Sequence, residues 1–173
     1  MNLTLIGMAG AGKSYLGKRL AKKLALEFID SDDRLAEKFG KPIQEILDEL
    51  GEKKYVETEA ALNIEHTMNR DDALISPSGS SIYSERWMDH LKDISIVVYL
   101  RVPYEMIEER LRDKPPRAII GLGRKTLHEL YDERHPLYEM HADISVDTAS
   151  RDLKEVEREI LDFLAAHGSK RSP

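Results

Sequence analysis

The stretch from residue 7 to residue 14, Gly-Met-Ala-Gly-Ala-Gly-Lys-Ser, constrains this chain more than any other feature. It fits the pattern Gly-x-x-x-x-Gly-Lys-Ser and directly follows an apolar run, Leu3–Ile6, that is typical of a buried strand. In such a loop consecutive backbone N–H groups surround an anion at the N-terminus of a helix. The motif predicts that Lys13 contacts the β- and γ-phosphates of a nucleotide and that the Ser14 hydroxyl coordinates Mg²⁺. The predicted nucleotide-binding residues of the loop are Gly7, Gly10, Ala11, Gly12, Lys13 and Ser14.

Beyond this loop, short apolar runs alternate with stretches of helical spacing. The further predicted strands lie around Phe28–Ile29, Ala73–Ile75, Ile94–Leu100 and Ile144–Val146. Between them, apolar positions recur every three or four residues, which is the spacing of one helix face. Strands that alternate with helices form a parallel sheet covered by helices. We therefore expect a single three-layer α/β domain with a five-stranded parallel sheet over residues 1–168 and a polar tail over 169–173.

The composition narrows the functions that such a domain can serve. The 173 residues include no cysteine, which excludes disulfides, thiol nucleophiles and cysteine-ligated metal sites. A formal net charge of −6 argues against broad nucleic-acid binding, because no excess of basic residues is available to contact phosphates. No apolar run is long enough to cross a membrane. We therefore expect a cytoplasmic, monomeric protein that binds small molecules.

The phosphate-binding loop alone does not define the reaction, because kinases, GTPases, motor ATPases and regulatory switches all use it. The chain has no Asn-Lys-x-Asp run, the sequence with which a GTPase reads guanine. The predicted strand Ala73–Ile75 ends in Ser76, whereas a remodelling ATPase has an acid at this point. These features favour a kinase over the other classes.

Two acids, Asp30 and Asp32, are predicted at the end of the second strand, at the same edge of the sheet as the phosphate loop. Ligands of open α/β sheets bind at this edge, and alternate residues of a strand face the same side. One carboxylate is therefore expected to hold Mg²⁺ through water, and the other to accept a hydrogen bond from a substrate hydroxyl. The alternative is that Asp32 or Asp33 caps a helix that starts at Arg34.

Together these features resemble the shikimate kinase family, small kinases with the nucleoside-monophosphate-kinase-like fold. The resemblance extends over most of the chain and depends on the spacing of many short motifs. These motifs are Leu5–Ser14, Leu16–Ala21, Phe28–Asp32, Ile43 and Ile46 before Gly51-Glu52, Glu59, Val97–Leu100, Arg117–Gly121, Arg134 with Pro136–Tyr138, and Val146–Thr148. The resemblance implies transfer of the γ-phosphoryl group of ATP, with Mg²⁺, to a hydroxyl of a small and anionic acceptor.

On the donor side, the resemblance assigns a role to each matching residue. Asp30 corresponds to the acid that orients the water shell of the metal, in addition to Lys13 and Ser14. Arg117 corresponds to an arginine of a mobile lid, here about residues 113–123, that closes over the phosphates. Arg110 and the backbone after Asp147 correspond to positions beside the adenine.

On the acceptor side, the sequence both matches and departs from the family. Asp32 corresponds to the acid that binds the acceptor hydroxyl, and Arg134 to an arginine that pairs with the substrate carboxylate. The family has a second carboxylate-binding arginine at the position of Val56, and valine cannot form a bidentate pair with a carboxylate. Lys53 and Lys54 are not expected to replace this arginine, because helical spacing directs their side chains away from the position of Val56.

The second departure is in the segment after the third strand. The family has three consecutive glycines there, of which only Gly79 remains between Ser78 and Ser80. Both departures affect the acceptor, whereas the phosphate side is intact. Three hypotheses follow: a shikimate kinase, a related kinase for another polyol or hydroxy acid such as a sugar acid, or a nucleotide-binding regulatory module without transfer activity.

Overall fold

The observed fold follows the alternation of strands and helices in the sequence. The computed structural model describes residues 1–112, 118–149 and 151–167, whose strands form one parallel sheet in the order β2-β3-β1-β4-β5. The strands are β1 (Asn2–Ile6), β2 (Glu27–Asp30), β3 (Ala73–Ser76), β4 (Ser95–Arg101) and β5 (Ile144–Asp147). The helices are α1 (Lys13–Leu24), α2 (Ser31–Phe39), α3 (Ile43–Leu50), α4 (Glu52–Thr67), α5 (Glu85–Ile94), α6 (Tyr104–Arg112), α7 (Leu127–His141) and α8 (Leu153–His167), with a 3₁₀ turn, η1, at Ser81–Tyr83. The predicted five-stranded parallel sheet is confirmed.

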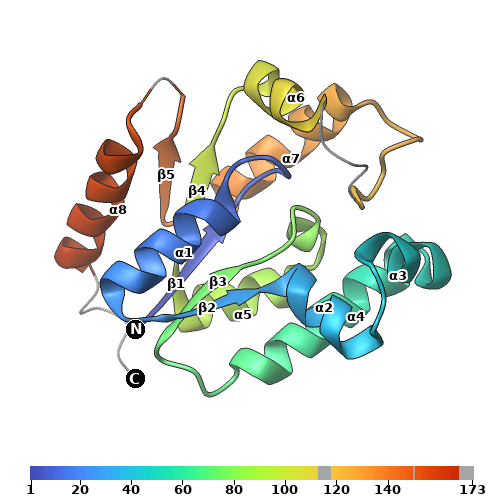
Figure 1. Cartoon of the computed structure of the whole chain (residues 1–173), viewed down its shortest axis with the longest axis horizontal. Helices are drawn as coiled ribbons and strands as arrows, with labels where there is room; N and C mark the ends of the chain where they lie inside the picture. The colour runs from blue at the N-terminus through green and yellow to red at the C-terminus, as the bar shows by residue number, and fades with distance from the viewer. Residues whose placement is uncertain (113–117, 150, 168–173) are drawn as a thin grey trace.

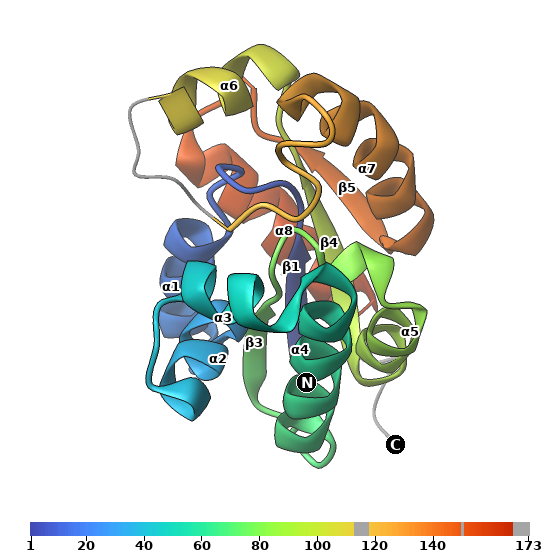
Figure 2. The same cartoon turned by 90° about the vertical axis from the view of Figure 1, so that its right-hand side faces the viewer.

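Helices cover both faces of the sheet (Figures 1 and 2). Helices α1 and α8 pack on one face, and α5 and α7 pack on the other. Helices α2, α3 and α4 lie beyond the β2 edge (Figure 1), where Leu35, Ile46 and Tyr55 form a second apolar cluster apart from the main core. None of the helices in the described part of the chain has the length and hydrophobicity needed to span a bilayer.

The strands are apolar because the sheet is covered on both faces. Every residue of β1 and β3 is buried, as are the first six residues of β4. Near-continuous apolar runs of this kind are typical of parallel strands, which have no solvent-facing side. The parallel register also aligns the carboxyl ends of the strands, so that Asp30 pairs with Ser76. The loops that follow β1, β2 and β3 therefore meet at one edge of the sheet.

The stretch from Thr126 to about Met140 predicts a helix, and Pro136 within it predicts a kink or an interruption. The predicted interruption is wrong, because α7 runs continuously from Leu127 to His141. A capping box between Thr126 and Glu129 fixes its N-terminus, and Tyr138 is buried in the following turn. Arg134 and Tyr138, two residues before and two after Pro136, are both buried, so the helix packs against the protein on either side of the proline.

The packing of α1 on the sheet depends on Gly17, and this leads to a first prediction. A Cβ atom at Gly17 would lie 2.6 Å from the Phe28 ring and 3.1 Å from Leu74. Gly17→Val should therefore lower the free energy of unfolding by about 1–3 kcal/mol through overpacking. Urea denaturation measures this change, with Lys22→Ala on the exposed face of the same helix as the control. An unchanged unfolding midpoint in Gly17→Val would contradict the packing that we describe.

Candidate active site

The phosphate loop connects β1 to α1 and has the backbone geometry that an anion site requires. Gly12 precedes α1 with a φ of 94°, a left-handed conformation that favours glycine, and no side chain caps the helix. The first N–H groups of α1 are therefore not occupied by a capping side chain. Lys13 Nζ donates to the carbonyl oxygens of Gly7 at 2.8 Å and Met8 at 3.2 Å, so its ammonium lies over the loop. The backbone N–H groups at the start of α1 and the Lys13 ammonium group therefore both lie at the phosphate loop, where an anion would bind.

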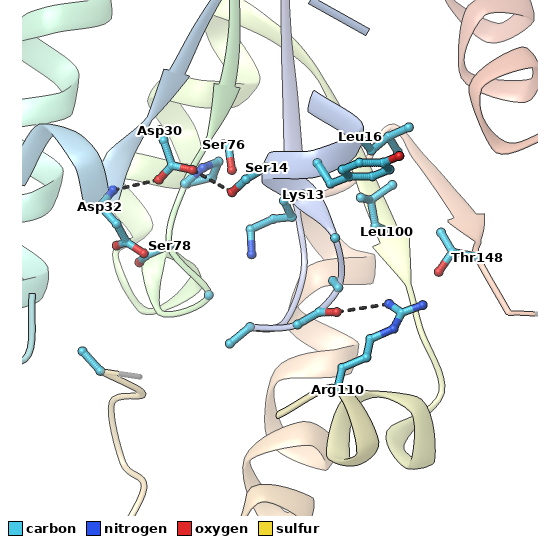
Figure 3. A pocket seen from close by; sticks show the side chains of 18 of the residues that line it. Lys13, Ser14, Leu16, Asp30, Asp32, Ser76, Ser78, Leu100, Arg110 and Thr148 are labelled. Carbon is cyan, nitrogen blue, oxygen red and sulfur yellow. Dashed lines mark hydrogen bonds between the residues drawn. The ribbon is translucent and has the colours of Figure 1, made fainter. Parts of the chain in front are cut away.

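Ser14 and Asp30 form a pair of oxygen ligands beside the loop. Ser14 Oγ donates to Asp30 Oδ2 at 2.8 Å, which joins the start of α1 to the end of β2 (Figure 3). Hydroxyl and carboxylate oxygens are the ligands that Mg²⁺ prefers, and Mg²⁺ is commonly held by one or two such groups together with substrate phosphates. Ser14 and Asp30 therefore fit the Mg²⁺ ion that the sequence predicts at this position.

The structure corrects the predicted position of Asp32. We placed it at the end of the second strand, but β2 ends at Asp30 and Asp32 lies in the first turn of α2. The capping residue is Asp30, whose Oδ1 accepts from the Asp32 backbone N–H at 3.1 Å. The alternative prediction, in which Asp32 or Asp33 caps a helix from Arg34, is therefore wrong. Asp32 nevertheless lines the same cavity as Ser14, because α2 begins at the edge where the phosphate loop lies.

The structure adds a contact between Tyr55 and Asp32 that sequence reasoning missed. The Tyr55 side chain is buried in α4, and burial together with the Asp32 charge and hydrogen bond raises the pKa of its hydroxyl. Tyr55 therefore stays protonated at neutral pH and donates to Asp32. The signal in the sequence is an aromatic residue, Tyr55, among mostly polar residues at the start of the helix, but its partner Asp32 is distant in the sequence.

Glu59 lies next to the same group and is almost fully buried, at 1% exposure. Its carboxylate accepts from Ser78 Oγ at 2.9 Å and from the Ser78 backbone N–H at 3.3 Å. Ser78 Oγ is in turn 3.0 Å from Ser80 Oγ. Burial, and then the neighbouring Asp32 charge, raise the pKa of Glu59 to about 8. Of the two serines that replace family glycines, Ser78 thus binds a buried acid directly, and Ser80 contacts Ser78.

The raised pKa of Glu59 predicts a pH dependence of stability. Its ordinary pKa is 4.5 and its folded value is about 8, so between these values the folded state holds a proton that the unfolded state has released. The free energy of unfolding should therefore fall as the pH rises from about 5 to about 8, and Glu59→Gln should lack this contribution. Urea denaturation across this range measures the difference, with exposed Glu57→Gln as the control. Parallel pH profiles for wild type and Glu59→Gln would contradict it.

These groups line one cavity of about 930 Å³ with two distinct ends (Figure 3). Asp32 and Ser78 lie on one side of Lys13, and Arg110 and Thr148 lie on the other. Arg110 Nη1 donates to the Gly10 carbonyl at 3.1 Å, which holds α6 against the phosphate loop. The structure thus places Arg110 and Thr148, on the predicted adenine side, and Asp32, on the predicted acceptor side, at opposite ends of one cavity.

Two acceptor-side positions, Arg134 and Val56, are not part of the lining of this cavity. Arg134 is 1% exposed and does not line the cavity, although it reaches the Gly79 carbonyl, which does. Val56 lines a second cavity of about 490 Å³ together with Ile120. Arg117 lies outside the described residues, so its role stays a prediction, as does the lid.

Comparisons with known proteins identify the family to which this chain belongs. The family model of shikimate kinase matches residues 9–165. The shikimate kinase of Francisella tularensis subsp. novicida is 36% identical over 165 residues, which is 94% of each chain. The chain belongs to the shikimate kinase family. It is accordingly a nucleotide-binding phosphotransferase that uses ATP and acts on an alcohol group, like the other members of this family.

Solved structures of the family have the same fold as this member. Shikimate kinase from Acinetobacter baumannii, in complex with shikimate, aligns with a TM-score of 0.84 and 31% identity over 96% of this chain and 93% of that one. Shikimate kinase from Aquifex aeolicus aligns with a TM-score of 0.79 and 27% identity over 97% and 98% of the two chains. The nucleoside-monophosphate-kinase-like fold implied by the sequence is confirmed.

Proposed function

We propose that this family member transfers the γ-phosphoryl group of Mg·ATP to a hydroxyl of shikimate or of a related hydroxy acid or polyol. The observation that carries the proposal is the shared cavity, in which the Asp32 carboxylate and the phosphate-binding Lys13 lie on adjoining walls. An acceptor hydroxyl beside Asp32 is then directed at a phosphate bound by the loop. Phosphoryl transfer is catalysed mainly by positioning and charge neutralisation, which these groups supply.

In the proposed reaction, a bond forms between the acceptor oxygen and the γ-phosphorus as the bond to the β-phosphate oxygen breaks. The hydroxyl proton passes to Asp32, which the Tyr55 hydroxyl keeps in place. Lys13 and the N-terminus of α1 stabilise the negative charge on the transferred group. Ser14 and Asp30 would hold Mg²⁺, which neutralises phosphate charge when it is bound. Arg117 and the segment 113–123 are proposed to close over the phosphates and exclude water.

A coupled assay of ADP release tests the proposal. The protein is given Mg·ATP with each member of a panel of hydroxy acids, sugars and polyols that includes shikimate, and products are checked by mass spectrometry for one added phosphoryl group. We expect ADP release that depends on one acceptor class. ATP binding without acceptor-dependent release for any compound would instead support a nucleotide-binding regulatory module.

A further inference from the structure

Glu52 belongs to a sequence motif, Gly51-Glu52, that the proposed reaction does not use. It is the first residue of α4, and its side chain faces the segment that leads into α7. Glu52 Oε1 accepts from the Gly121 backbone N–H at 2.9 Å, and Oε2 forms an ion pair with Arg124. An acid in the first turn of one helix thus binds a backbone group that is 69 positions away in the sequence.

The peptide group between Ile120 and Gly121 is held from both sides by charged side chains. Its N–H donates to Glu52, and its carbonyl oxygen accepts from Arg134 Nη2 at 2.6 Å. Hydrogen bonds that involve an ionised group are stronger than those between neutral groups. The next carbonyl, that of Gly121, accepts from two backbone N–H groups of the turn that follows. The backbone therefore has a defined orientation at this point.

The contact with Gly121 is the stronger of the two that Glu52 makes. Burial raises the pKa of Glu52, but the Gly121 N–H and then Arg124 outweigh burial and hold the pKa below its ordinary value of 4.5. The Arg124 side chain is 72% exposed, and ion pairs in such positions contribute little. Gly121 is buried, where an N–H group that loses its acceptor is costly. Glu52 therefore acts on the protein mainly through this backbone hydrogen bond.

The Ile120–Gly121 peptide lies next to the walls of the active-site cavity. Ala118, two residues earlier, lines that cavity. Ile120 is buried in the same apolar cluster as Tyr55, whose hydroxyl contacts the proposed base. Arg134, which holds the carbonyl of this peptide, also reaches the Gly79 carbonyl at 3.4 Å, and Gly79 is a second wall residue. A shift of the peptide would therefore displace groups on two walls.

We propose that Glu52 is a positioning residue for phosphoryl transfer, which fixes the Ile120–Gly121 peptide and through it the cavity walls at Ala118 and Gly79. Glu52 is outside the described lining of the cavity, so it acts through the peptide and through Arg134. The inference rests on the proposed function, because Gly79 adjoins the end of the cavity that is proposed to bind the acceptor. Such a role is sensitive to small shifts, since a displacement of about 1 Å can cost roughly 100-fold in rate.

Two substitutions of similar length test the inference, because one keeps a hydrogen-bond acceptor and the other removes it. Glu52→Met leaves the Gly121 N–H without its acceptor, and we expect kcat/KM for the acceptor to fall roughly 10- to 100-fold. In Glu52→Gln the amide oxygen still accepts from Gly121, so kcat/KM should stay within about threefold of the wild type. The probe is shikimate, or the compound of the panel above that is turned over fastest. The calorimetric Kd of Mg·ATP should stay within about twofold in both variants, because the phosphate loop is not altered.

Arg124→Ala is the matched control, because it removes the exposed ion pair and keeps the hydrogen bond from Gly121. It should behave like the wild type. Glu52→Ala, with a smaller side chain and no acceptor, is measured alongside and should show the same loss as Glu52→Met.

Hydrogen exchange of the Gly121 amide, followed by NMR, gives a readout that does not depend on turnover. Exchange should be faster in Glu52→Met and Glu52→Ala than in the wild type, and unchanged in Arg124→Ala. Unchanged exchange, or faster exchange with an unchanged kcat/KM, would overturn the inference and leave the proposed function intact. An equal loss of kcat/KM in Arg124→Ala would overturn it as well. ATP binding with no ADP release from wild type for any compound would overturn the proposed function, and the inference with it.

Discussion

Asp32→Asn should lower the kcat of phosphoryl transfer by roughly 10²–10⁴-fold, the range of a general base, while ATP binding remains intact. The amide cannot take the hydroxyl proton, although its oxygen can still accept from Tyr55. The fold should tolerate the change, because Asp30 rather than Asp32 caps α2, through an interaction with the backbone of residue 32. Steady-state kinetics with a saturating acceptor and calorimetric titration of ATP measure the two quantities separately.

Asp33→Asn is the matched control for this substitution. Asp33 lies in the same first turn of α2 but is exposed and does not line the cavity. We expect its kcat to equal that of the wild type. Full activity of Asp32→Asn would mean that the acceptor binds elsewhere, and the proposed site would then be wrong.

The sequence predicted the fold well because its signals are local. Each of the five predicted strands is an apolar run, and residues such as Gly40 and Gly51 end helices where the pattern ends. The phosphate loop identified the first strand of the sheet. Because helices alternate with the strands that follow, the strands are expected to be parallel. Pro136 is the exception, because α7 continues through it, with the buried residues Arg134 and Tyr138 on either side.

The site was harder to predict where the backbone signal was ambiguous. The Asp-Ser-Asp-Asp run at residues 30–33 fits either the end of a strand or the beginning of a helix. Acids are favoured both at the N-cap of a helix and in its first turn, so residue type does not show which acid is the cap. The structure assigns Asp30 to the cap, and this moves Asp32 from a strand to a helix. Both residues still line the predicted cavity, because the two elements meet at its edge.

Contacts between distant residues could not be obtained from a single sequence. Glu59 lies in a helix with many polar residues, and its buried carboxyl group is hydrogen-bonded to Ser78, which is 19 positions away. Arg134 matched a family position, but its three acceptors come from η1, the loop after β3 and the segment before α7. The resemblance predicts a ligand-binding arginine, and that role stays a prediction; only the tertiary structure shows that the same side chain also joins these protein segments.

Lys13→Met should reduce kcat by roughly 10²–10³-fold, because it removes the cation that stabilises charge on the transferred phosphoryl group. ATP affinity should fall as well, since the same ammonium contacts the phosphates before transfer. Methionine keeps most of the side-chain length but cannot donate to the carbonyl oxygens of Gly7 and Met8. Lys22→Ala, at an exposed position of the same helix, controls for loss of charge and should leave both quantities unchanged. A kcat within about tenfold of the wild type would show that Lys13 acts in ground-state binding rather than in the transition state, because only interactions that strengthen in the transition state raise kcat.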